Sequence, residues 1–78
     1  MKTLIIEDET AAAVNLRALL AEVEPSIEVI SVLESVAESV DYLRTNPTPE
    51  LIFMDIHLAD GDSFKIFKHV EVNCPIVF

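Results

Sequence analysis

Three acidic residues follow apolar runs at two places in this chain of 78 residues. Glu7 and Asp8 come directly after residues 4–6, and Asp55 comes directly after residues 51–54. In an open parallel sheet, ligands bind beyond the carboxyl ends of the strands, where the strand order reverses. If these runs form neighbouring strands, their carboxylates converge, repel one another and raise at least one pKa unless a cation joins them. Oxygen ligands with room for water suit Mg²⁺ better than zinc, so the pattern predicts a magnesium site. The alternative is that these acids only cap helices or face solvent.

A carboxylate beside a bound cation can also accept a phosphoryl group, which forms an aspartyl phosphate. Phosphoryl transfer depends mainly on positioning and charge neutralisation, and a cation supplies much of both. Asp55 is the best candidate nucleophile because it follows the most apolar run and precedes a turn with Gly61, the single glycine of the chain. That single glycine excludes the Walker loop and the dinucleotide fingerprint, which need several glycines.

Short apolar runs and helical patterns alternate along the chain and would position these acids. The runs are rich in β-branched or aromatic residues and mostly apolar on both faces, as in the buried strands of a parallel sheet. They are residues 4–6, 29–32, 51–54 and 75–78. The order β-α-β-α-β-α-β implies parallel strands joined by right-handed crossovers, and therefore a doubly wound α/β sheet.

Apolar stripes at helical spacing predict three helices. The first helix ends before Pro25, the second ends at Asn46, and the third begins after a cap at Asp62 or Ser63. The three stripes are Ala12, Leu16, Leu19, Leu20 and Val23; Ala37, Val40 and Leu43; and Phe64, Phe67 and Val70.

Smaller patterns complete the expected structure. Ser35 and Glu38 have the spacing of a capping box at the start of the second helix. Asp60 and Asp62 are expected to be turn and cap residues. We expect all four phenylalanines to lie in the core, namely Phe53, Phe64, Phe67 and Phe78.

Composition excludes several classes of function. The hydrophobic fraction of 51% is too high for a disordered chain, although 14 acidic against 5 basic residues give a charge of −9. This acidity argues against a nucleic-acid surface and against binding to anionic membranes, both of which need a cationic patch. No apolar run has the roughly 18 residues of a membrane span, and the first residues lack the features of a signal peptide. Cys74 is alone and cannot form an internal disulfide, so we expect a cytoplasmic protein.

The residues around the candidate site resemble a known family. Residues 4–9 (LIIEDE) and 51–58 (LIFMDIHL) are similar to the receiver domain of two-component response regulators. Residues 55–64 resemble the branch whose output domain is of the LytTR DNA-binding type. The resemblance covers the whole chain and implies a flavodoxin-like sheet with strand order 2-1-3-4. It also implies that residues 1–78 are one receiver domain truncated after the fourth strand, without the fifth strand and the last helices.

The resemblance implies a role for each site residue. Asp55 is the phosphoacceptor, which a sensor histidine kinase loads from its phosphohistidine; Asp8 binds Mg²⁺ directly and Glu7 mainly through water. His57 contributes its backbone carbonyl to the ion. Receivers also carry a Ser or Thr after the fourth strand and a Lys after the fifth, and both positions lie beyond Phe78. The implied protein is a switch that regulates transcription through its own output domain, not an enzyme, and this segment itself contacts neither nucleic acid nor membrane.

Two other functions remain open. A pseudo-receiver or dimerisation module would use the apolar run at residues 75–78 as an open sheet edge that pairs with a second copy. A haloacid-dehalogenase-like phosphatase also has an Asp nucleophile after a strand, but its motif needs a second Asp where this chain has His57. His57 and His69 lack further ligands for zinc, and Cys74 lacks the partners of a nucleophile. We expect a fragment of a longer protein, with a naturally short chain completed by dimerisation as the alternative.

Overall fold

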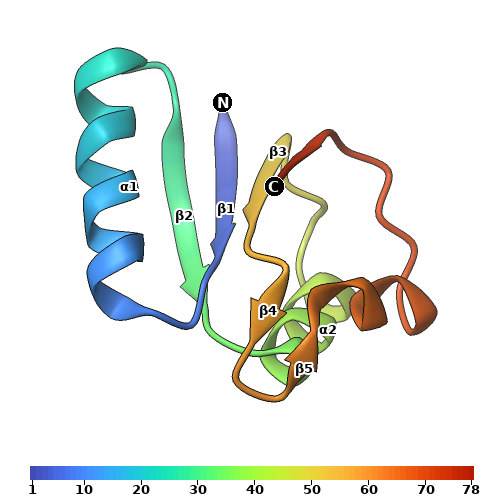
Figure 1. Cartoon of the computed structure of the whole chain (residues 1–78). Helices are drawn as coiled ribbons and strands as arrows, with labels where there is room; N and C mark the ends of the chain where they lie inside the picture. Colours follow the sequence, from blue (N-terminus) through green and yellow to red (C-terminus); the bar gives the residue numbers. More distant parts are fainter.

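The chain folds into a four-stranded parallel sheet with helices on both sides. The structure, a computed structural model, describes residues 1–78. The predicted doubly wound sheet with strand order 2-1-3-4 is confirmed, because the observed order is β2-β1-β3-β6 and all neighbours are parallel. The strands are β1 (Lys2–Ile6), β2 (Glu28–Leu33), β3 (Leu51–Met54) and β6 (Ile76–Val77) (Figure 1).

Two helices, a small hairpin and a 3₁₀ helix connect these strands. Helix α1 lies on one side of the sheet, and α2 with the 3₁₀ helix lies on the other (Figure 1). No helix in the structure is both long enough and apolar enough to cross a membrane. The connecting elements are α1 (Thr10–Val23), α2 (Val36–Thr45), the antiparallel strands β4 (His57–Leu58) and β5 (Gly61–Asp62), and η1 (Ser63–Lys68).

The main core lies between the sheet and the α2–η1 side. Leu4 and Ile6 of β1 point into it, whereas Ile5 points to the α1 side, because successive strand residues alternate between faces. All three side chains are fully buried, as expected for a central parallel strand. Eight buried residues form this core: Leu4, Ile6, Leu33, Val36, Ile52, Met54, Leu58 and Ile66.

Helix α1 covers only part of the opposite face. Ala13, which the predicted stripe leaves out, is its one buried residue. Leu19 and Val23 belong to the stripe but are 55% and 69% exposed. A cleft of about 250 Å³ remains open on this side, and Leu16 of α1 and Phe53 of β3 are among the residues that line it. The predicted helix is therefore correct, while its buried face is only partly as predicted.

The third helix differs from the prediction because it is a six-residue 3₁₀ helix. Asp62 caps it as expected, since its Oδ1 accepts a hydrogen bond from the Phe64 N–H at 2.8 Å. In a 3₁₀ helix every third residue shares a face, so Ser63 and Ile66 turn inward and are fully buried. Phe64 and Phe67, which the α-helical stripe placed on the sheet, are 46% and 39% exposed. The predicted inward face was therefore wrong for Phe64 and Phe67, whereas Val70, the third residue of the predicted stripe, lies after η1 and packs against the core.

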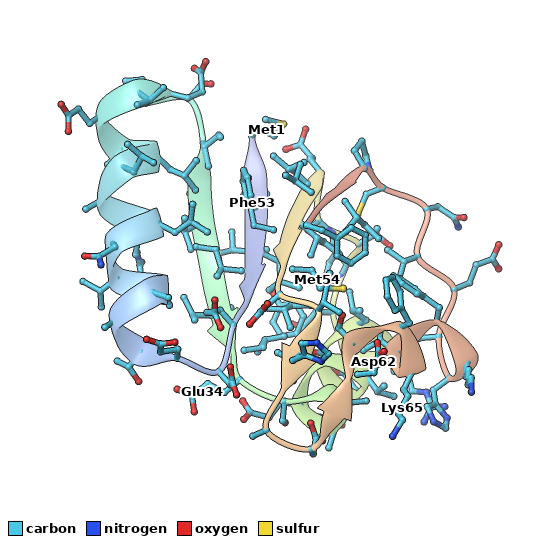
Figure 2. The ribbon with its side chains drawn as sticks, viewed as in Figure 1. Met1, Glu34, Phe53, Met54, Asp62 and Lys65 are labelled. Atoms are coloured by element: carbon cyan, nitrogen blue, oxygen red, sulfur yellow. The ribbon has the colours of Figure 1, made fainter.

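The phenylalanines are mostly surface residues, contrary to prediction. Phe64 packs on Phe78 with ring centroids 5.2 Å apart, and Phe78 is 58% exposed. Phe67 lies beside Phe64, also near the surface. Only Phe53 on β3 is half-buried within the sheet. Lys65 on η1 points away from the sheet (Figure 2).

Candidate metal centre

Strands β1 and β3 bring the acidic residues to one edge of the sheet. The two strands pair in parallel with Ile6 opposite Met54, so the residues that follow them leave the sheet side by side. The Asp55 N–H donates to the Ile6 carbonyl at 2.9 Å, and the Glu7 N–H donates to the Leu33 carbonyl at the end of β2 at 2.8 Å. These bonds extend the backbone pairing past the strand ends and fix the backbone beneath the acidic side chains.

The carboxylates of Glu7, Asp8 and Asp55 meet at this edge. One oxygen of each lies within 4.8 Å of the others. The convergence expected from neighbouring strands is therefore present. The backbone also orients two of the groups, because the Ile56 N–H donates to Asp55 Oδ1 at 2.8 Å and the Glu9 N–H donates to Glu7 Oε2 at 3.3 Å.

The crowding of these acids affects the ionisation of Glu7. Burial raises the pKa of the Glu7 carboxyl, and a hydrogen bond with Asp55 and repulsion from the Asp55 charge raise it further. The Glu9 N–H works in the opposite direction because it stabilises the charged form. A cation shared by the three groups would remove this repulsion.

The donor set fits a hard divalent cation. Glu7, Asp8 and Asp55 offer only oxygen ligands, and all three retain access to solvent, so water can complete an octahedral shell. Zinc favours nitrogen and sulfur ligands, and neither is part of this cluster. The three residues are therefore the ones that could hold a magnesium ion.

The remaining predicted candidates lie apart from this cluster or have other roles. His57 begins β4, two positions after Asp55, with an exposed side chain, and the role of its backbone carbonyl stays a prediction. His69 is exposed after η1, where its carbonyl accepts a hydrogen bond from Arg44 Nη2 at 3.0 Å. Burial raises the pKa of the half-buried Cys74 thiol, the opposite of what an activated nucleophile needs.

Asp60 has a role that its position in the sequence does not reveal. The prediction that Asp60 is a turn or cap residue is confirmed, but the helix that it caps begins 24 positions earlier. Its Oδ1 accepts from the Val36 N–H at 2.7 Å and its Oδ2 accepts from the Ala37 N–H at 3.0 Å. These two hydrogen bonds lower the pKa of Asp60. Ser35 adds the expected cap, because its hydroxyl accepts from the Glu38 N–H at 3.0 Å.

Comparison with curated proteins finds relatives in sensory transduction. No family model matches the chain. The whole chain aligns with the sensory transduction protein LytT of Enterococcus faecalis at 33% identity and with LytT of Bacillus anthracis at 32%. It aligns over 91% of its length with the sensory transduction protein LytR of Staphylococcus haemolyticus at 34% identity. The chain spans about one third of the length of these relatives, namely 33%, 32% and 27% in the same order.

Solved structures share the fold. The response regulator PhyR from Brucella abortus superposes with a TM-score of 0.82 over 99% of this chain and 32% of its own, at 22% identity. A mutant of the anti-anti-sigma factor PhyR from Bartonella quintana gives a TM-score of 0.71 over 96% of this chain and 32% of its own, at 21% identity. Both agree with the flavodoxin-like fold expected from the sequence.

Proposed function

We propose that this chain, a response-regulator receiver-like domain by its sequence relatives and its fold, accepts a phosphoryl group on Asp55 with the help of Mg²⁺. The observation that carries the proposal is the meeting of Glu7, Asp8 and Asp55 within 4.8 Å at the carboxyl edge of a parallel sheet. Such an edge is where ligands bind in open α/β folds.

The chemistry is a transfer from one nucleophile to another. An Asp55 carboxylate oxygen attacks the phosphorus of a phosphohistidine; an O–P bond forms, the N–P bond breaks, and the histidine nitrogen leaves with the electron pair. Because the Ile56 N–H holds Oδ1, we assign Oδ2 as the attacking oxygen. A bound Mg²⁺ supplies charge neutralisation at the phosphoryl oxygens. Glu7, Asp8 and Asp55 would hold that ion, and the backbone carbonyl of His57 would add a further oxygen ligand.

The wider role that we propose is signalling rather than enzymatic turnover. The phosphoryl donor is a sensor histidine kinase, and the response passes to an output domain outside this chain, of the LytTR DNA-binding type, in the cytoplasm. The relatives named as sensory transduction proteins support this placement. The charge of −9 supports a segment that does not itself touch nucleic acid.

Mass spectrometry of the intact chain tests the proposal. Incubation with acetyl phosphate and Mg²⁺ should add one phosphoryl group, and chelation of the metal should prevent it. Asp55→Asn should abolish the addition, while Asp41→Asn, which neutralises an exposed carboxylate on α2, should not. An unmodified wild-type chain, or equal labelling of Asp55→Asn, would contradict the proposal.

One observation favours the dimerisation module as a second candidate. Strand β6 pairs only with β3, and Val77 and Phe78 at this edge are 46% and 58% exposed. An open apolar edge can pair with another strand. Light scattering across a concentration series separates the candidates, because a strict monomer at high concentration would argue against pairing through β6.

A further inference from the structure

Three backbone segments surround the acidic cluster, and each is tied to the next. The Glu7 N–H donates to the Leu33 carbonyl, which joins the end of β1 to the end of β2, from which the chain continues into α2. The Asp55 N–H binds the Ile6 carbonyl, which joins the end of β3 to the end of β1. Both links are backbone hydrogen bonds, of 2.8 and 2.9 Å, so they do not depend on side chains.

The third link is made by a side chain. Residues 55–60 run from the candidate phosphoacceptor into the β4–β5 hairpin, and Asp60 at their end binds the Val36 and Ala37 N–H groups of α2. Its two bonds bridge 24 and 23 positions of sequence. Together the three links close a ring through the end of β1, the β2–α2 connection, the first turn of α2 and the loop that begins at Asp55.

We infer that Asp60 is a positioning residue for Asp55, because it closes this ring and holds the loop that carries the phosphoacceptor against α2. Leu58 anchors the same hairpin in the core, where it is 7% exposed. The burial of Leu58 holds the hairpin against the core, whereas the hydrogen bonds of Asp60 hold it against the first turn of α2. Side chains must be held closely for a metal site to form, and loss of an outer partner commonly costs tenfold or more in metal affinity.

The expectation that loss of the Asp60 link weakens Mg²⁺ binding rests on the proposed function. The expectation that it loosens the loop after Asp55 rests only on the observed hydrogen bonds. The experiment therefore has two readouts. The first is amide hydrogen exchange by NMR at Ser63, whose N–H closes the hairpin by binding the Ile56 carbonyl at 2.8 Å. The second is Mg²⁺ affinity by calorimetry.

The test variants remove the link in two different ways. Asp60→Asn leaves at most one acceptor oxygen for two N–H donors. Val36→Pro removes the donor of the 2.7 Å bond and keeps every charge. Proline is accepted at the first helical position, and Ser35 before it is already extended, with φ −144° and ψ 163°.

The controls separate positioning from helix capping and from charge. Ser35→Ala removes a cap of the same helix without touching the hairpin. Asp41→Asn removes one negative charge from α2 without touching the ring. We expect both link variants to speed exchange at Ser63 and to weaken Mg²⁺ binding about tenfold, while both controls leave these two readouts near wild type.

Specific results would overturn the inference. If Asp60→Asn and Val36→Pro speed exchange only in the first turn of α2, as Ser35→Ala does, Asp60 is a helix cap and nothing more. If the wild-type chain binds no Mg²⁺, the proposed function fails, and the exchange at Ser63 still decides the positioning role. If one link variant does not fold, the other carries the test, because the two alter different elements.

Discussion

Neutralising Asp55 without changing its shape should stabilise the metal-free fold. Folding brings carboxylate oxygens of Glu7, Asp8 and Asp55 within 4.8 Å of one another, whereas in the unfolded chain Asp55 is far from the other two. At that distance each pair repels by about 0.9 kcal/mol in a water-like dielectric. Asp55→Asn removes two of the three pairs, or about 1.8 kcal/mol, and screening at physiological ionic strength reduces this to about 1 kcal/mol. Asn keeps an Oδ1 that can accept from the Ile56 N–H.

Urea unfolding followed by circular dichroism measures this change. In chelator, Asp55→Asn should raise the free energy of unfolding by about 1 kcal/mol, and Asp41→Asn should leave it nearly unchanged. Mg²⁺ at about ten times its dissociation constant should stabilise the wild-type chain by about 1.4 kcal/mol and the Asp55→Asn chain by much less. The reasoning is refuted if Asp55→Asn and Asp41→Asn behave alike, or if Mg²⁺ stabilises both Asp55 forms equally.

Three further predictions concern ionisation, capping and the core. Because folding raises the pKa of Glu7, the folded chain holds this proton more tightly than the unfolded chain. Its contribution to stability is therefore largest below the ordinary glutamate pKa and is lost as pH rises through the raised value. Mg²⁺ affinity should rise with pH over the same window, and Glu7→Gln should flatten both profiles; unchanged profiles would contradict this. Ser35→Ala should cost about 1 kcal/mol in urea unfolding, and no loss would mean that the hydroxyl does not cap α2. Ile66→Ala should lower the free energy of unfolding by about 2–5 kcal/mol because Ile66 is fully buried, whereas Phe64→Ala should lower it by less than about 1 kcal/mol because Phe64 is 46% exposed. A larger loss for Phe64→Ala than for Ile66→Ala would instead favour the predicted α-helix, in which Phe64 faces the sheet.

The strands and the acidic cluster were predictable because their signals are local. Residues 4–6 and 51–54 are apolar on both faces, which identifies central parallel strands, and an acid after each strand must then lie at the shared edge. Strand adjacency was the one assumption needed, and the pairing of Ile6 with Met54 satisfies it. The metal and phosphoryl roles of these residues stay predictions.

The errors arose where tertiary structure decides between local alternatives. Phe64 and Phe67 fit an α-helical stripe, but the segment forms a 3₁₀ helix whose inward positions are Ser63 and Ile66. The partners of Asp60 lie 23 and 24 positions away, so no short pattern contains them. For η1 the hydrophobic pattern identified the element without fixing which of its side chains face inward, and for Asp60 the sequence indicated a cap without indicating which helix it caps.

The central claim is that Glu7, Asp8 and Asp55 form one site for a divalent cation. Calorimetric titration of the metal-free chain with Mg²⁺ tests it most directly. We predict saturable binding of one ion per chain, which Asp8→Asn removes and Asp41→Asn preserves. Absence of saturable binding, or undiminished binding by Asp8→Asn, would contradict the claim.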